Sequence, residues 1–369
     1  MARIIYFSND YCTHDYRYLS TIKDVGHEVF HVRLEGNLRQ TEDRPVPEGV
    51  EIVQWAGGKD KFRWLDLPKY VLSLRRVIKR IQPDLIHAGP IQTCAFIAVL
   101  TGFRPILTMS WGFDLMQDVH RNRWWEWVTG YVLKRSTYFT SDAMVTRDKA
   151  VAYGMYPDRT VVFPWGVDLG HFSPKNWQTG KTDKQENAFA LFCNRSWEPR
   201  YGVDVLARAF VRAAQSRPEL SLTLLGGGSQ GARIRQILHS GGVLDRVTFG
   251  GQISQNELPR WYHWADVYIS PSHVDGSSVS LMEALACGLP CLVSDIPANK
   301  EWVTEGENGW LFPDGDVDAL AVKILQAMDQ RKSLPKIGNA ARAVAEERAD
   351  WKKNSAKLMQ AYEEALQLK

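Results

Sequence analysis

The chain has 369 residues, a formal net charge of +3 and 44% hydrophobic residues. This length predicts two domains, and the composition is typical of a globular protein rather than of a disordered or nucleic-acid-binding one. The five cysteines lack the paired spacing of a metal site, so we expect reduced thiols in a cytoplasmic protein. The start of the chain lacks the apolar core of a signal peptide, and the longest apolar run, residues 94–100, is too short to span a bilayer.

Strand-like and helix-like segments alternate through the first half of the chain. The segments expected to form strands are residues 3–8, 28–32, 83–87, 105–109, 143–146 and 160–163. The segments expected to form helices are a run ending at Val25 and residues 67–82 and 92–100. This alternation predicts a doubly wound parallel sheet, in which ligands bind beyond the carboxyl ends of the strands.

Residues 120–139 are rich in both aromatic and basic side chains. One interpretation is a membrane-surface segment with Trp and Arg or Lys at the level of the lipid headgroups. The other, which we favour, is a core-facing helix with a basic outer face. The basic residues of 67–82 keep peripheral contact with the cytoplasmic face of a membrane open as a hypothesis.

The second half repeats the alternation after a polar segment. We expect a first domain over residues 1–170, a linker over 171–187, a second domain over 188–350 and a final helix over 351–369. The expected strands are residues 188–193, 220–225, 246–249, 266–270 and 291–293. The expected helices are 202–214, a run ending at His239, 279–287, 316–328 and 349–368. Trp351, Leu358, Tyr362 and Leu366 lie at helical spacing and indicate a packing face on the last helix.

The loop between the strand at 266–270 and the helix at 279–287 has the features of an anion site. Ser277 and Ser278 are suitable N-caps, and the free N–H groups at a helix start attract phosphate. Gly276 permits close approach to the backbone, while Asp275 and Glu283 are suited to accept hydrogen bonds from sugar hydroxyls. The alternative is that these acids are solvated or cap a helix, as in many α/β proteins.

These residues resemble the donor-binding signature of retaining glycosyltransferase family 4, in the GT-B superfamily. The matching positions are an acid, seven other residues, a Glu and an Ala-x-Ala-x-Gly-x-Pro run: Asp275, Glu283, Ala284, Ala286, Gly288 and Pro290. The resemblance implies that Glu283 holds the nucleotide ribose. It also implies that Asp275 and the backbone of Gly276, Ser277, Ser278 and Val279 hold the transferred sugar and the diphosphate, with Gln252 and Ile253 at the base.

Two arginines and a glycine complete the expected donor site. Arg195 follows a buried strand, where its planar fork would bond two phosphate oxygens at once; a salt-bridged surface arginine is the alternative. The family usually has a Lys just before the next Gly, a position that is Tyr201 here, so Arg200 is the candidate for a second cation. Gly227, in a run of three glycines after a strand, would allow close approach of a nucleotide.

The expected acceptor side departs from the family pattern. Trp111 occupies the position of a usual His, and an indole cannot exchange a proton as an imidazole does, although it can stack on a sugar face. The acceptor-side candidates are Asp10, His14, His87, Trp111 and Asp114. A lone loop His is more often structural than functional.

The resemblance implies two Rossmann-like domains facing across a cleft, the first binding the acceptor and the second the donor, with the last helix crossing back to the first. The implied activity is retaining, metal-independent and cofactor-free transfer of a sugar from a nucleoside-diphosphate sugar to a hydroxyl of a glycan, glycolipid or polysaccharide precursor. Two alternatives stay open: a nucleotide-sugar epimerase or phosphorylase on the same fold, and an inactive nucleotide-sugar-binding partner subunit.

Overall fold

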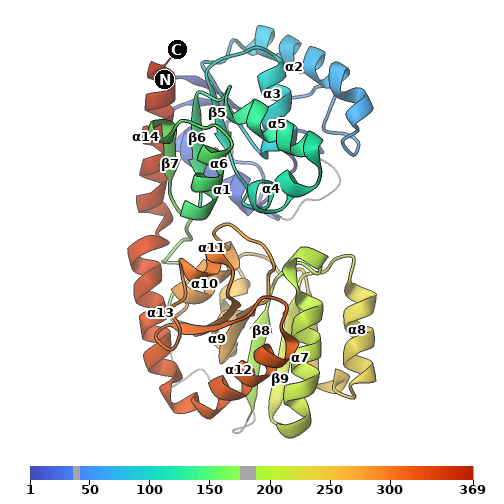
Figure 1. Ribbon diagram of the computed structural model, residues 1–369. Helices are drawn as coiled ribbons and strands as arrows, with labels where there is room; N and C mark the ends of the chain where they lie inside the picture. Colours follow the sequence, from blue (N-terminus) through green and yellow to red (C-terminus); the bar gives the residue numbers. More distant parts are fainter. Residues whose placement is uncertain (36–41, 175–187, 369) are drawn as a thin grey trace. The chain divides into compact units, whose positions relative to one another are not determined.

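The computed structural model describes residues 1–35, 42–174 and 188–368, which form two compact units (Figure 1). The first unit comprises Met1–Trp165 together with the chain from Lys353 onward, and the second comprises Gly166–Lys352. Most of the expected linker, residues 175–187, lies outside the described residues, as does residue 369 of the expected last helix.

The first unit is built on a parallel sheet with the strand order β3-β2-β1-β4-β5-β6-β7. Its strands are β1 (Arg3–Ser8), β2 (Glu28–Arg33), β3 (Val50–Ile52), β4 (Leu85–Ala88), β5 (Ile106–Met109), β6 (Tyr138–Ser141) and β7 (Thr160–Val162). The central strands are buried along their length, which is why they read as continuous apolar runs in the sequence. The doubly wound parallel sheet is therefore confirmed, and the short strand β3 was not predicted.

Helices connect most of these strands, because neighbouring parallel strands need a crossover. They are α1 (Thr13–Asp24), α2 (Leu67–Ile81), α3 (Phe96–Leu100), α4 (Phe113–Met116), α5 (Arg123–Leu133) and α6 (Met144–Ala152). The last helix of the chain, α14 (Trp351–Gln367), belongs to this unit from Lys353 onward. A 3-10 turn, η1 (Trp64–Asp66), precedes α2, and a π-helical turn, η2 (Ile91–Ala95), precedes α3. The last helix contributes the buried side chains of Leu358 and Tyr362 to the first unit.

One strand of the first unit was placed wrongly from the sequence. The chain from Met144 is helix α6, and the strand is β6, which pairs Leu107 with Tyr138. The β-forming side chains of Tyr138 and Phe139 lie at the end of the aromatic segment 120–139, for which a helix is predicted, but that helix ends at Leu133. The Ser141 hydroxyl donates to the carbonyl of Ala143 at 2.9 Å and so turns the chain before the helix.

The second unit is a parallel sheet with the strand order β10-β9-β8-β11-β12-β13. Its strands are β8 (Phe189–Cys193), β9 (Leu220–Leu225), β10 (Val247–Gly251), β11 (Val267–Ser270), β12 (Cys291–Ser294) and β13 (Gly309–Phe312). Its helices are α7 (Val203–Ser216), α8 (Gly231–Ser240), α9 (Leu258–Trp264), α10 (Val279–Ala286), α11 (Pro297–Lys300), α12 (Val317–Asp329) and α13 (Leu334–Arg348). The strand β13 and the helices α9, α11 and α13 were not predicted.

Candidate functional site

The strand order of the second unit brings the predicted donor residues to one edge of the sheet. Gln252 follows β10, Gly227 follows β9, Arg195 follows β8 and Asp275 follows β11, and these strands are neighbours in that order. Because all four strands are parallel, the loops after them meet at the edge formed by the carboxyl ends. Arg195 and Asp275, which are 80 residues apart in sequence, thus come into direct contact.

Arg195 is the centre of this edge. Its guanidinium donates to the Asp275 carboxylate at 2.6 Å, to the Ser278 hydroxyl at 2.8 Å and to the Ser280 hydroxyl at 3.1 Å. The side chains of Arg195 and Asp275 are only 11% and 15% exposed, so this is a well-shielded ion pair. The ring of Tyr201 lies 4.3 Å from the guanidinium carbon and covers it as a cation–π contact.

Burial and pairing act in opposite directions on these two charges. Burial lowers the pKa of Arg195, but the charge of Asp275, together with smaller contributions from Tyr201, Tyr268 and Cys193, offsets burial and holds the pKa above its ordinary value. Burial raises the pKa of Asp275, and the shift is partly offset by Arg195 and by the backbone N–H of Gly276. The pair therefore fixes a cation at the sheet edge whose charge does not change in the physiological pH range.

The start of α10 lies at the same edge of the sheet, beside Arg195. Ser278 is its N-cap, and its hydroxyl accepts from the N–H of Leu281 at 3.4 Å. Gly276, Ser277 and Ser278 are buried and Val279 is half-buried. The first N–H groups of a helix have no partner within it, so this turn offers donors and the positive end of a helix dipole beside Arg195.

Glu283 lies one turn into α10 and is buried in a hydroxyl network. The Tyr262 hydroxyl donates to Glu283 Oε2 at 2.8 Å, and it accepts from the Asn194 amide at 2.9 Å. Burial, followed by the charge of Glu283, raises the pKa of Tyr262 well above its ordinary value, so the phenol stays a donor. This network fixes the orientation of the carboxylate before any ligand arrives.

The network contains residues that were not predicted from the sequence. Tyr262 lies on the unpredicted helix α9, and Asn194 immediately precedes Arg195. The Tyr268 hydroxyl donates to Ser280 at 2.8 Å, yet Tyr268 reads in the sequence as one more apolar strand residue. The only signal available was the unusual presence of tyrosine in buried positions, since a buried phenol needs a hydrogen-bond partner.

The other predicted donor residues lie on neighbouring loops. Gly227 has open space where a side chain would project, and the loop is tied to the next strand by the N–H of Gly226, which donates to Gly251 at 2.6 Å. Gln252 is exposed and Ile253 is half-buried in the turn after β10. Arg200 lies on η5 (Pro199–Tyr201), and its carbonyl accepts from the N–H of His273 in the loop that carries Asp275.

In the first unit, Asp114 organises the turn that carries Trp111. Its carboxylate accepts from the Ser110 hydroxyl at 2.6 Å and from the N–H groups of Trp111, Leu115 and Ile91 at 2.9 to 3.2 Å. Burial raises the pKa of Asp114 to about 6 despite these donors. Asp114 is completely buried, whereas Trp111 is half-buried, so the acid supports the turn and the indole is its accessible part.

The two histidines predicted for the acceptor side have different surroundings. His87 is fully buried in β4; its Nδ1 lies 2.6 Å from the Tyr362 hydroxyl of α14, and burial lowers its pKa to about 3. This placement favours a packing role for His87. His14 is half-buried, with its ring centroid 3.9 Å from that of Trp165 and 5.9 Å from that of Trp111. Burial, followed by the charge of Arg17, lowers the pKa of His14 well below its ordinary value.

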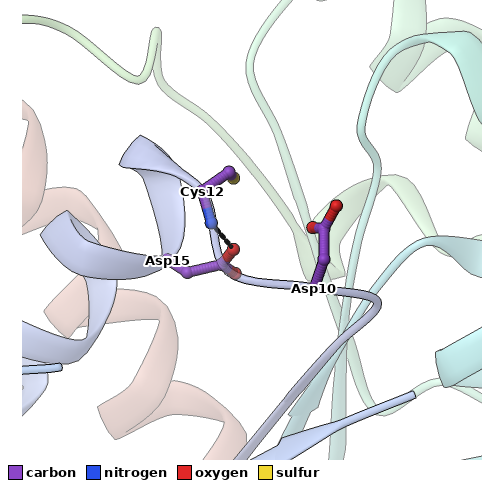
Figure 2. Close-up of side chains that lie close together, drawn as sticks. All are labelled: Asp10, Cys12 and Asp15. Carbon is purple, nitrogen blue, oxygen red and sulfur yellow. Dashed lines mark hydrogen bonds between the residues drawn. The ribbon is translucent and has the colours of Figure 1, made fainter. Parts of the chain in front are cut away.

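Asp10 lies beside the first turn of α1 (Figure 2). One ligand atom from each of Asp10, Cys12 and Asp15 falls within 4.8 Å of the others, a spacing that a metal ion could use. Asp15, however, is already committed: it accepts from the N–H of Cys12 at 2.7 Å and from the Tyr6 hydroxyl at 2.9 Å. Capping of α1 accounts for the contact between Cys12 and Asp15, and we assign no metal to the cluster.

Within residues 1–35, 42–174 and 188–368, none of the helices combines the length and the apolar character that crossing a membrane requires. The exposed tryptophans of α5 are instead a surface feature of the first unit.

Comparisons with known proteins agree with this architecture. The family described as glycosyl transferase 4-like matches residues 3–143, and the family described as glycosyl transferases group 1 matches residues 175–344. A phosphatidyl-myo-inositol mannosyltransferase of Mycolicibacterium smegmatis is 30% identical over 206 residues, which are 55% of this chain and 51% of the relative. A GDP-mannose-dependent alpha-(1-6)-phosphatidylinositol monomannoside mannosyltransferase of Mycobacterium tuberculosis is 27% identical over 313 residues, 79% of this chain and 78% of the relative.

The chain thus spans about half the length of the M. smegmatis relative. Among solved structures, a sucrose-phosphate synthase from Thermosynechococcus elongatus aligns with a TM-score of 0.82 and 19% identity, covering 98% of each chain. The two parallel-sheet units therefore form the GT-B fold. The two family matches fall one on each half of the chain, and together they show that it belongs to the glycosyl transferase group 1/glycosyl transferase 4-like family.

Proposed function

We propose that the protein is a retaining glycosyltransferase that moves a sugar from a nucleoside-diphosphate sugar to a hydroxyl acceptor and requires no metal or other cofactor. The observation that carries this proposal is the contact of Arg195 with Asp275, Ser278 and Ser280 at the start of α10. This contact places a shielded cation beside a helix N-terminus, which is the arrangement that binds a diphosphate.

Donor recognition divides between charge and hydroxyl chemistry. The diphosphate would accept from the N–H groups of Gly276 to Val279 and from Arg195, with Arg200 as a second cation. The buried Glu283 carboxylate would accept from the ribose hydroxyls, because a carboxylate beside a phosphate is tolerated only if it meets neutral donors. Asp275 would do the same for the transferred sugar, while Gly227, Gln252 and Ile253 would lie against the nucleotide.

Catalysis in this proposal is stabilisation of the leaving group. As the bond between the anomeric carbon and the diphosphate breaks, negative charge grows on the phosphate oxygens, and fixed donors that are already oriented stabilise it without reorganisation. The tight contacts of Arg195 supply that orientation. The acceptor hydroxyl attacks the anomeric carbon on the face from which the leaving group departs, and its proton passes to the departing phosphate oxygen as the bond between that oxygen and the anomeric carbon breaks; attack on this face gives retention.

The second unit would bind the donor and the first unit the acceptor, with Trp111, His14, Asp10 and the Asp114-supported turn on the acceptor side. The names of the relatives make GDP-mannose the first donor to test and a phosphatidylinositol-type lipid the first acceptor class. A carbohydrate acceptor remains the other arm of the experiment.

The test starts with donor binding. Purified protein is screened by thermal shift and calorimetry against GDP-mannose, UDP-glucose and ADP- and dTDP-sugars, and the best ligand is then titrated into Glu283→Gln. Because this substitution removes the charge from the hydrogen bonds to the ribose, we expect the donor to bind about 10- to 100-fold more weakly. Glu305→Gln, an acid on the surface of the same unit, is the matched control and should leave affinity unchanged.

Product analysis then separates the alternatives. Transfer that needs an acceptor, persists in EDTA and keeps the anomeric configuration supports the proposal. Donor converted without any acceptor would identify an epimerase, and turnover that requires inorganic phosphate would identify a phosphorylase. Tight donor binding without turnover on either acceptor class would identify an inactive binding subunit.

A further inference from the structure

Four large apolar side chains are exposed on η1, α2 and α5 of the first unit. We define the α2–α5 face as the side chains of Leu65, Leu72, Trp124 and Trp127 with the rings that support them. These four are 86%, 54%, 48% and 50% exposed. They come from η1, α2 and α5, which lie together with α3 in the first unit (Figure 1). Large contiguous apolar patches on a protein surface mark sites of interaction.

The rings of the α2–α5 face form a continuous, ordered ridge. The Trp124 and Trp127 rings stack with centroids 5.0 Å apart, and Tyr131 continues the row at 5.0 Å from Trp127. Trp64 contacts Trp124 at 6.1 Å and Phe62 at 5.0 Å. Neighbouring rings hold the two tryptophans in place, so little side-chain entropy remains to be lost when a partner covers their outer faces.

The same two segments are strongly basic. Residues 60–82 and 121–135 contain eleven Lys and Arg against three acids, Asp60, Asp66 and Glu126. Within the described part of the chain, only Arg63 and Arg80 among the eleven lie within 4.0 Å of a carboxylate, each at 3.9 Å. Arg135 instead lies over the Tyr131 ring at 3.8 Å, which keeps its charge next to the ridge.

A hollow of about 580 Å³ adjoins the ridge at the start of α2. Its polar lining has three cations, Lys61, Arg63 and Lys69, against two acids, Asp60 and Asp66, and its aromatic wall is Phe62 and Tyr70. Phe62 belongs both to this wall and to the ridge, because its ring contacts Tyr70 at 5.7 Å and Trp64 at 5.0 Å. The hollow therefore opens where aromatic and basic side chains meet, and its volume suits a small polar group such as a phosphorylated headgroup.

We propose that the α2–α5 face docks on an anionic lipid bilayer, with Trp124 and Trp127 at the headgroup level and the surrounding Arg and Lys against lipid phosphates. Trp is the side chain that most favours the bilayer interface, and a basic surface is attracted to anionic lipid. A second copy of this chain is a poorer occupant, because two faces of the same charge excess would repel each other. The proposal concerns binding and does not rest on the glycosyltransferase activity.

The test is co-sedimentation of the full chain with vesicles of phosphatidylcholine alone and of phosphatidylcholine with phosphatidylglycerol. We expect binding to the mixed vesicles only, and a decline as NaCl is raised. The pair Trp124→Ala/Trp127→Ala should lower the partition coefficient at least about tenfold. Each of Lys69→Gln, Arg76→Gln and Lys79→Gln should lower it about fivefold.

Matched controls keep the readout specific. Tyr156→Ala removes another exposed aromatic side chain of the same unit, and Arg260→Gln removes an exposed cation of the second unit; neither should change sedimentation. Circular dichroism melts of every variant confirm that these exposed sites leave the fold intact. Equal binding to neutral vesicles, no binding to anionic ones, or unchanged binding of the tryptophan pair would overturn the proposal. So would a wild-type dimer in analytical ultracentrifugation that the tryptophan pair dissociates, since the occupant would then be a second copy.

Discussion

Replacing Arg195 by alanine is expected to have two separable effects, one on stability and one on turnover. The side chain makes three hydrogen bonds of 2.6 to 3.1 Å in a shielded place, one of them to the Asp275 carboxylate. Removing one partner of such a pair leaves an uncompensated charge, which costs about 3–5 kcal/mol of the free energy of unfolding. Losing one fixed donor to a developing negative charge should lower kcat by about 10²- to 10³-fold.

A second substitution distinguishes the two effects. In Arg195→Ala/Asp275→Asn the stranded charge is gone, so most of the lost stability should return, as measured by urea denaturation. Turnover should not return, because the cation that meets the diphosphate is still absent and the Asp275 carboxylate proposed for the transferred sugar is lost as well. Arg195→Lys keeps the charge but cannot span three acceptors with a planar fork, so we expect stability and kcat between those of the wild type and the alanine variant.

The control is Arg233→Ala in the same unit, which removes an exposed arginine 3.4 Å from Asp204. Surface pairs of this kind contribute less than about 1 kcal/mol, and turnover should be unchanged. Recovery of kcat along with stability in the double variant would refute the leaving-group role. A loss confined to KM for the donor would also refute it, because it would show equal binding of ground and transition states.

Two further predictions concern the first unit. The pKa of Asp114 lies at about 6 in the folded protein, above the value of an unfolded Asp, so its stabilising contribution is full below about pH 4 and is lost as pH rises through 6. Between about pH 4 and pH 6 the free energy of unfolding of the wild type, measured by urea denaturation, should therefore fall by about 3 kcal/mol, and that of Asp114→Asn should not. The control Asp60→Asn, at an exposed position, should show the same fall as the wild type. Parallel pH curves for the wild type and Asp114→Asn would contradict the assignment. Tyr362→Phe leaves the buried His87 Nδ1 without its hydrogen-bond partner and should lower the free energy of unfolding by about 1–3 kcal/mol in the same assay. Tyr156→Phe, at an exposed position, is the control. An unchanged urea midpoint for Tyr362→Phe would contradict the prediction.

Local signals made the central part of the second unit predictable. The strand β11 is marked by a run of β-branched and aromatic residues, and the loop up to Ser278 by small polar residues. The helix α10 is marked by a serine cap at its start and a glycine at its end. Because neighbouring strands are parallel, knowing that Arg195 and Asp275 each follow a strand was enough to expect them at one sheet edge. The contact between them needed no further information.

The hydroxyl network around Glu283 was not predictable in the same way. Asn194, Tyr262 and Glu283 come from three segments, and each looks ordinary in its own sequence context. The prediction of a strand at residues 143–146 was wrong for a related reason. The true strand β6 follows an aromatic helix without a strong break, and only its pairing with β5 and β7 distinguishes the two. Partners far apart in sequence decide such cases, and periodicity carries no information about them.

The replacement of the family's usual Lys by Tyr201 changes how the charge balance at the sheet edge is reached. A lysine there would place a second compact cation beside the buried pair, whereas the Tyr201 ring covers the Arg195 guanidinium at 4.3 Å and adds no charge. Burial raises the pKa of Tyr201, so the phenol also contributes no negative charge that would compete with a phosphate. The diphosphate would then depend on Arg195, on the N–H groups at the start of α10 and on Arg200, whose backbone is held by the loop of Asp275. A site with fewer fixed cations should be more sensitive to the loss of any one of them, which is the physical reason to expect the largest catalytic defect at Arg195.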